Sequence, residues 1–383
     1  MKVLTFLKTW SVLTLAMGAA ACGESHGAGH GGTPMASSNP PSSIPIASID
    51  TDAVYVVNGG DATISVIDPS AGAVVGTIRL QNVAYPHHVY LSPDRSRLAI
   101  GVPGHDLSMG HGASPMPGEG EHGAGHGPAM PHGSSGTSAK GAVLVLDART
   151  GAMIASRTLE APNHNAVYSK DGSEIWTALL SDPGAVLVLD AATLETKQTI
   201  AVGRVPAEVT FSPDGTRAFV ANGTSDDVTV LDAATKVVLK TIPVGREPVG
   251  AWPGADGLMY VDCEKAKTLE VIDPNTLEIV RSYALGFTPG MAAVPSTATE
   301  ELWVSNADGG KIVFNTTRTT TPVAEVTTAP GTHAFAFAPD GTAAFVTNQL
   351  DDSISVVDMR TRAIRSTIKV GQKPNGIVFR SAR

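Results

Sequence analysis

The chain has 383 residues, of which 42% are hydrophobic and only 16% are charged, and it contains 40 glycines and 26 prolines. This composition favours a turn-rich, all-β protein over a helical or a disordered one. The net charge of −9 at pH 7 argues against nucleic acid as a partner, because an acidic surface repels phosphate. Two cysteines are too few for a disulfide framework.

Residues 1–21 have the pattern of a secretory signal peptide, with two lysines, an apolar run and a small-residue end. The run is too short for a stable transmembrane helix. It ends in AAAC (residues 19–22), which resembles a bacterial lipobox, although Ala19 stands where Leu is usual. We therefore expect Cys22 to be lipidated, which would anchor the protein in the bacterial cell envelope, facing the periplasm or the exterior. Without lipid on Cys22, cleavage after an Ala-x-Ala pattern would give a soluble periplasmic protein.

A flexible lipoprotein tether is predicted next, over residues 22–50, where Gly, Ser and Pro are frequent. The folded domain is then expected to span residues 51–383. With Cys22 carrying lipid, Cys263 would remain as a single thiol, and a small buried hydrophobic residue is its simplest interpretation.

Similar segments recur along this domain every 41–43 residues, which indicates a repeat architecture. Successive units open at Asn163, Pro206, Pro248, Pro289, Thr332 and Pro374. Pro86 opens a unit that is about 35 residues longer than the others and therefore carries an insertion.

Each unit contains four short alternating runs separated by turn signals, as in Val205–Gly245 with VTFS, AFVAN, VTVLD and VLKTI. Four strands per unit of this length are typical of a β-propeller blade. We predict an all-β, seven-bladed β-propeller whose last blade combines N-terminal strands B, C and D with C-terminal strand A. Val54–Leu80 and Gly376–Phe379 would then share one sheet, and this closure would hide both sheet edges.

Aspartates and asparagines recur at fixed places in the units, which favours structural roles in turns over catalysis. The aspartates that follow the third strands are Asp68, Asp147, Asp190, Asp232, Asp273 and Asp358, with Asn315 in one unit. The asparagines that end the second strands are Asn58, Asn222, Asn306 and Asn348.

The motifs YVVN, FVAN, WVSN and FVTN, followed by SVID, TVLD or SVVD and by SPDG, resemble the YVTN family of seven-bladed propellers. The resemblance covers about Ala53–Phe379 and implies YncE-like periplasmic or lipoprotein propellers as relatives. It says little about function, because similar propellers range from surface-layer proteins to enzymes. Lactonases and nitrous oxide reductase also contain such propellers, and in the latter, histidines at inner strand ends hold copper on the ring axis.

Three histidines occupy the same position of the repeat, at the start of the predicted innermost strand: His87, His164 and His333. Three neutral imidazoles that converge on the axis would form a transition-metal site. Asn375 holds this position in the neighbouring blade. His88 and Glu208 come one residue later, so strand alternation should turn them away from the axis into supporting roles. The alternative is that these polar residues only bind channel water.

The insertion spans residues 103–139 and should leave from the rim that carries these histidines. It contributes the candidate ligands His105, Met109, His111, Met116, His122, His126, Met130 and His132. Thioethers select Cu(I) or Ag(I) and imidazole binds either oxidation state of copper, so copper is the expected metal, with zinc or silver as alternatives. A Gly-rich loop that merely tolerates histidine remains the simpler interpretation.

Two classes of function stay open. The first is a non-enzymatic envelope protein that binds metal through the loop and the central histidines. The second is an enzyme, either a copper-dependent oxidoreductase or a lactonase-like hydrolase. A metal-free scaffold for a periplasmic protein partner is a third reading, common for propellers.

Overall fold

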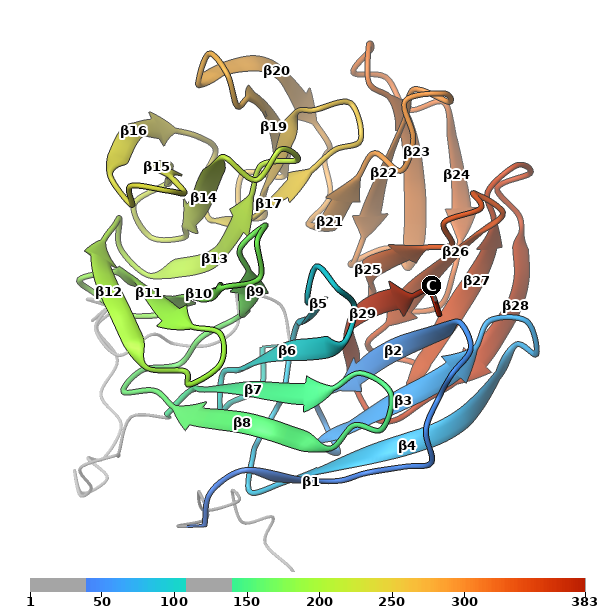
Figure 1. The fold of residues 1–383 in the computed structure, drawn as a ribbon. Helices are drawn as coiled ribbons and strands as arrows, with labels where there is room; N and C mark the ends of the chain where they lie inside the picture. Colours follow the sequence, from blue (N-terminus) through green and yellow to red (C-terminus); the bar gives the residue numbers. More distant parts are fainter. Residues whose placement is uncertain (1–38, 108–139, 383) are drawn as a thin grey trace, which may run out of the picture. The chain divides into compact units, whose positions relative to one another are not determined.

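The computed structural model describes residues 39–107 and 140–382, and within them the chain forms seven antiparallel sheets arranged as a ring (Figure 1). Contacts between the innermost strands of neighbouring blades close the ring, and between blades 2 and 3 the innermost strand of blade 3 contacts the second strand of blade 2. The prediction of an all-β, seven-bladed propeller is confirmed. No helix among the described residues is long and apolar enough to cross a membrane.

The first three blades follow one another along the chain. Blade 1 contains β5 (Val89–Leu91), β6 (Arg97–Val102), β7 (Ala142–Asp147) and β8 (Met153–Thr158). Blade 2 contains β9 (Val167–Tyr168), β10 (Glu174–Leu179), β11 (Ala185–Asp190) and β12 (Thr196–Ala201). Blade 3 contains β13 (Pro206–Phe211), β14 (Arg217–Asn222), β15 (Asp227–Asp232) and β16 (Val238–Pro243).

Three further blades repeat this order. Blade 4 contains β17 (Pro248–Pro253), β18 (Met259–Cys263), β19 (Thr268–Asp273) and β20 (Glu278–Ala284). Blade 5 contains β21 (Pro289–Ala293), β22 (Glu301–Asn306), β23 (Lys311–Thr316) and β24 (Ala324–Thr327). Blade 6 contains β25 (Thr332–Phe337), β26 (Ala343–Asn348), β27 (Ser353–Asp358) and β28 (Ile364–Lys369).

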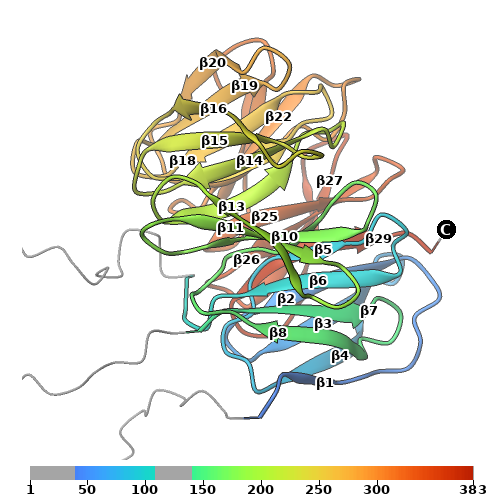
Figure 2. The ribbon, with the colours of Figure 1, turned by 60° about the vertical axis from the view of Figure 1, so that its left-hand side comes forward.

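Blade 7 joins the two ends of the described chain. Its strands are β2 (Ala53–Asn58), β3 (Thr63–Asp68), β4 (Ala73–Gln81) and β29 (Pro374–Arg380), as the sequence predicted. A fifth strand, β1 (Ser42–Ile44), pairs with the outer edge of β4 (Figure 2). The prediction that residues 22–50 form a tether is therefore wrong for residues 42–50, because this stretch buries apolar side chains on the propeller.

The hydrophobic core lies between neighbouring sheets, where alternate residues of the middle strands pack against the next blade. The predicted turn aspartates bind backbone amides, as when Asp232 Oδ1 accepts from Ala234 N at 3.1 Å and from Thr235 N at 2.8 Å. The asparagines bind polar groups of the adjacent strand, as when Asn348 donates to Ser353 and Ser355 at 3.0 Å each. These recurring residues therefore serve the fold. Cys263 is a buried free thiol, as expected.

The start of the innermost strand is irregular in most blades. The register between first and second strands shifts at this point in blades 3 to 7, which is the signature of a β-bulge. Blade 1 behaves in the same way: His87 N donates to Gly101 O at 2.9 Å, and Gly101 N donates to His88 O at 3.1 Å. Two residues therefore oppose one, and the ordinary alternation of side chains is interrupted.

Candidate metal centre

Four imidazoles gather where the inner strands of blades 1, 2 and 6 begin. The rings of His87 and His164 lie 4.2 Å apart between centroids, and the ring of His333 lies 6.3 Å from that of His87. All three side chains are buried. The three histidines that share one position of the repeat thus meet near the axis from different blades.

His88 is at the centre of this group, which the sequence prediction did not anticipate. Its ring centroid lies 4.7 Å from His87, 4.9 Å from His164 and 5.8 Å from His333. The expectation that alternation turns His88 away from the axis is wrong, because the bulge opposite Gly101 lets both consecutive histidines face the same region.

Close approach of the neighbouring blade makes this crowding feasible. A Cβ at Gly101 would lie 2.7 Å from both the Cα of Asn165 and the carbonyl oxygen of His164, so only glycine fits there. Gly101 therefore serves two purposes: it opposes the bulge of blade 1 and it admits the inner strand of blade 2.

Glu208 contacts two of the histidines at once. Its Oε1 lies 3.0 Å from His88 Nε2 and 2.8 Å from His164 Nδ1, and its side chain is fully buried. Asn165 Nδ2 lies 3.4 Å from the other oxygen, Oε2. Glu208 of blade 3 therefore contacts candidate ligands from both blade 1 and blade 2.

The charges around Glu208 favour its ionised form. Burial alone would raise the pKa of Glu208, but the charges and hydrogen bonds of His88 and His164 hold that pKa well below its ordinary value. Burial lowers the pKa of His164 more than Glu208 raises it. At neutral pH the pair is therefore a carboxylate and a neutral imidazole, and a neutral imidazole is the form that can bind a metal.

Aromatic residues lie next to the cluster, two residues further along the inner strands. The Tyr90 ring lies 6.4 Å from His88, and the Trp252 ring lies 6.0 Å from it, from the inner strand of blade 4. Burial and the carboxylate of Glu208 raise the pKa of the Tyr90 phenol well above its ordinary value. Its hydroxyl therefore stays protonated and donates to Glu208. Neither residue was predicted from the sequence, although both occupy one position of the repeat.

Asp262 on β18 is a second buried acid of this region. Its Oδ1 accepts from Trp252 Nε1 at 2.7 Å and from Gly250 N at 3.0 Å. Burial and the nearby charge of Glu208 raise the pKa of Asp262 well above its ordinary value, so this carboxyl holds a proton more readily than a free one. Sequence reasoning missed it, because its relevance depends on a tryptophan on the neighbouring strand.

The donor atoms of His87, His88 and His164 fit a transition-metal ion. One nitrogen from each lies within 4.8 Å of the others, and this trio is the one such group found among the described residues. A metal bound at about 2.0–2.1 Å from each nitrogen needs nitrogens about 3.4 Å apart, so modest rotations of the rings would close the site. His333 is outside this trio, which therefore differs from the predicted set by exchanging His333 for His88.

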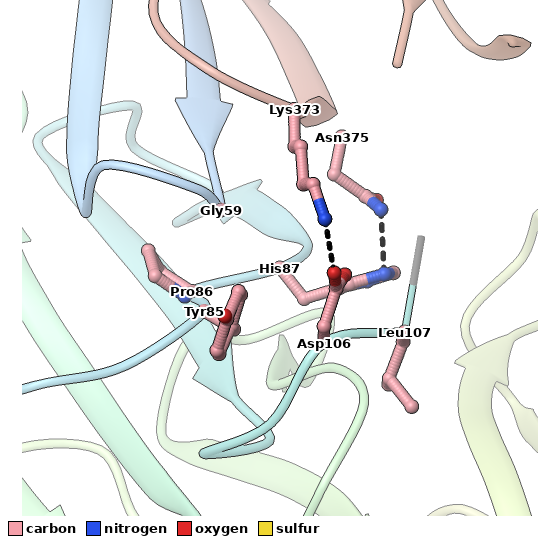
Figure 3. Close-up of a pocket in the computed structure, with 8 residues that line it drawn as sticks. All are labelled: Gly59, Tyr85, Pro86, His87, Asp106, Leu107, Lys373 and Asn375. Carbon is pink, nitrogen blue, oxygen red and sulfur yellow. Dashed lines mark hydrogen bonds and ion pairs between the residues drawn. The ribbon is translucent and has the colours of Figure 1, made fainter. Parts of the chain in front are cut away.

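The first residues of the insertion lie beside the cluster. Asp106 forms an ion pair with Lys373, and both line a small pocket with His87, Leu107 and Asn375 (Figure 3). His105 is close enough to His164 for its charge to lower the pKa of that histidine. The other insertion candidates, Met109, His111, Met116, His122, His126, Met130 and His132, fall outside the described residues, as does Cys22.

These features define the chain as a seven-bladed β-propeller with a histidine cluster at one end of its axis. No protein-family model matches the sequence, and no curated protein matches it. Solved structures do match, including the periplasmic gluconolactonase PpgL of Pseudomonas aeruginosa, with a TM-score of 0.66, 19% identity and coverage of 87% of this chain and 99% of that one.

Two further propellers show the same likeness. A functionally unknown protein from Desulfotomaculum acetoxidans has a TM-score of 0.66 and 11% identity, covering 86% of this chain and 99% of that one. The dihydro-heme d1 dehydrogenase NirN, in complex with DHE, has a TM-score of 0.58 and 14% identity, covering 88% and 79%. Identities this low establish the shared fold and leave function to be argued from the site.

Proposed function

We propose that this chain is a bacterial cell-envelope lipoprotein of the YVTN propeller type that binds a transition metal, copper above all, at the end of its axis. The observation that supports this most directly is the buried trio of His87, His88 and His164 backed by the Glu208 carboxylate. In metal sites the second ring N–H of a ligating histidine commonly donates to a carboxylate, and Glu208 offers such an acceptor to both His88 and His164.

The preference for copper rests on the composition of the insertion. Its methionines supply thioethers, which prefer Cu(I) or Ag(I), whereas its histidines bind copper in both oxidation states. A site for zinc alone would need no thioether. In this proposal the insertion captures copper and the central cluster holds it or passes it on, and zinc and silver are the competing metals to test.

The proposed location follows from the N-terminal sequence. A signal peptide over residues 1–21 and lipid on Cys22 would attach the domain to a membrane through the anchor alone. Mass spectrometry of the native protein should find an acylated Cys22 in the membrane fraction. An unmodified N-terminus in the soluble fraction would contradict the anchor but leave the metal site untouched.

Metal titration of the purified, metal-free protein tests the central proposal. We expect one tight copper equivalent that disappears in the His87→Ala/His88→Ala/His164→Ala variant, together with weaker equivalents that persist because they belong to the insertion. Isothermal titration with a competing chelator measures both classes. Retention of the tight equivalent in the triple variant would show that the cluster is not the site.

An enzymatic function is the second candidate, and one contact favours it. Neutral His164 beside the Glu208 carboxylate has the form of a general base, which a lactonase-like hydrolase could use. A copper-dependent oxidoreductase would use the same histidines as ligands. Screens for lactone hydrolysis with and without copper separate these readings, and a protein that binds no metal and shows neither activity would fit a scaffold for protein partners.

A further inference from the structure

Four polar groups from blades 1 and 2 surround the buried Glu208 carboxylate. Oε1 lies close to nitrogens of His88 and His164, Oε2 lies 3.4 Å from Asn165 Nδ2, and the Tyr90 hydroxyl also donates to this group. A carboxylate has about four lone-pair positions, which is enough to accept from all four groups. An ionised carboxylate accepts and never donates.

Because an ionised Glu208 can only accept hydrogen bonds, it determines which nitrogens of the neighbouring imidazoles carry hydrogen. Since Glu208 only accepts, the atoms that face it, His164 Nδ1 and His88 Nε2, must each carry a hydrogen. A neutral imidazole with its hydrogen at that position has its lone pair on the opposite atom, which is Nε2 in His164 and Nδ1 in His88. The two histidines are held in opposite tautomers by one oxygen.

We propose that Glu208 is the positioning residue of the metal centre, and that it directs the metal to His88 Nδ1 and His164 Nε2. The metal half of this inference rests on the proposed function, whereas the tautomer half concerns the metal-free protein. No bond is made to Glu208 itself. Its role is to fix which ring nitrogen of each histidine carries the lone pair.

The position of Glu208 explains why a carboxylate, and no neutral side chain, suits this place. A glutamine of the same size has one accepting oxygen and one donating NH₂ group. Its oxygen could accept from one imidazole N–H, but its NH₂ group would then face the N–H of the other imidazole, and two donors cannot form a hydrogen bond. That imidazole must then turn or change tautomer, and it would present an N–H where the metal needs a lone pair.

Nitrogen-15 NMR of histidine-labelled, metal-free protein tests the tautomers directly. Long-range couplings within each ring assign the protonated nitrogen, and His88→Gln and His164→Gln variants assign the two rings. We expect the Nδ1–H form for His164 and the Nε2–H form for His88. Finding His164 as the Nε2–H tautomer would overturn the inference, whether or not the protein binds metal.

Copper titration of Glu208→Gln tests the metal half, with Glu174→Gln as the matched control. Glu174 is also a buried glutamate, but its partners are Lys197, Lys236 and Trp176, away from the histidines. Glu208→Gln should weaken the tight copper site by 10- to 100-fold and change its Cu(II) EPR spectrum, whereas Glu174→Gln should alter neither.

The outcomes separate the two proposals. Wild-type affinity in Glu208→Gln, with the expected tautomers in the wild type, would refute the positioning of metal by Glu208 and leave the metal centre standing. Absence of any tight copper in the wild-type protein would refute the proposed function, while the NMR result would still decide the role of Glu208 in setting the rings. If Glu208→Gln does not fold, Glu208→Asp provides the same comparison, because it keeps the charge but cannot reach both rings.

Discussion

Asn375 Nδ2 lies 2.5 Å from His87 Nε2, so the last strand of the propeller contacts the metal-site candidate on blade 1. The two residues are 288 positions apart in the chain. Asn375 reaches His87 because β29 completes blade 7 beside the N-terminal strands. Closure of the ring therefore places a hydrogen-bond partner beside one of the three proposed ligands.

Replacing Asn375 by Ala should loosen His87 without damaging the fold. Blade 3 already has Ala207 at this position of the repeat, so the scaffold tolerates the smaller side chain. We expect the free energy of unfolding to change little and the tight copper affinity to fall about tenfold, because the ring loses the partner that orients it. Thermal unfolding and a competitive copper titration measure the two effects. Unchanged affinity would mean that Asn375 does not orient a ligand.

Single alanine substitutions of the histidines should separate the trio from His333. Loss of His87, His88 or His164 removes one donor and should weaken tight binding by at least tenfold, about 1.4 kcal/mol. His333→Ala is the matched control, because His333 is buried near the same axis but outside the trio. His333→Ala should weaken tight copper binding less than alanine at any of the three trio positions. A larger loss in His333→Ala than in His88→Ala would restore the set that the repeat position alone suggested.

The segment before the first blade strand should stabilise the seam between blades 7 and 1. Ile46 N donates to Thr150 O at 2.9 Å and Ile49 N donates to Arg149 O at 3.0 Å, while both isoleucines pack on the core. Deleting residues 39–50 should lower the free energy of unfolding by about 2 kcal/mol, from lost apolar burial and hydrogen bonds. Denaturant unfolding measures this loss, and deletion of residues 23–38 is the control. Equal stability of the two deletions would contradict the role of the segment.

Acid should destabilise the propeller partly through its turn aspartates. Side-chain hydrogen bonds from Ser212 and Thr216 and the Thr216 amide lower the pKa of Asp214 to about 2, and Asp94 and Asp171 have the same value for similar reasons. Because these folded-state pKa values lie below those of the unfolded chain, the stabilisation is complete above about pH 4 and is lost as pH falls toward 2. In unfolding experiments between pH 2 and 5, the free energy of unfolding of Asp214→Asn should therefore fall less steeply with decreasing pH than that of the wild type. The same dependence on pH in both proteins would show that Asp214 does not contribute to the loss of stability in acid.

The repeat could be recognised from sequence because it is a local property that recurs. Strand alternation and the SPDG-type turns predict four strands per unit, and the shared position of His87, His164 and His333 could be read by counting. His88 could not be placed in this way, since a bulge breaks the alternation on which counting depends.

The contacts of Glu208 could not be predicted from the sequence either, because its partners belong to blades 1 and 2. Residues of two other units converge on this carboxylate, and no spacing within a unit encodes those contacts. Tyr90 and Trp252 belong to the same class: their position in the repeat was visible, but their proximity to the axis was not. The strand β1 escaped notice because only three residues pair, in a stretch whose Ser and Pro content is typical of a linker.

Deleting most of the insertion should reduce the number of copper ions that the protein binds without weakening the tight central site. Removal of residues 108–139, with a short Gly-Ser linker in their place, keeps the ion pair between Asp106 and Lys373 and all three proposed central ligands. Thermal unfolding should be nearly unchanged, because added loop length costs a fold little. Copper titration should show fewer equivalents, with the one tight equivalent retained. If the shortened protein binds as many equivalents as the full chain, the His and Met residues of the insertion do not capture copper; if it loses the tight equivalent, the central cluster cannot bind metal without them.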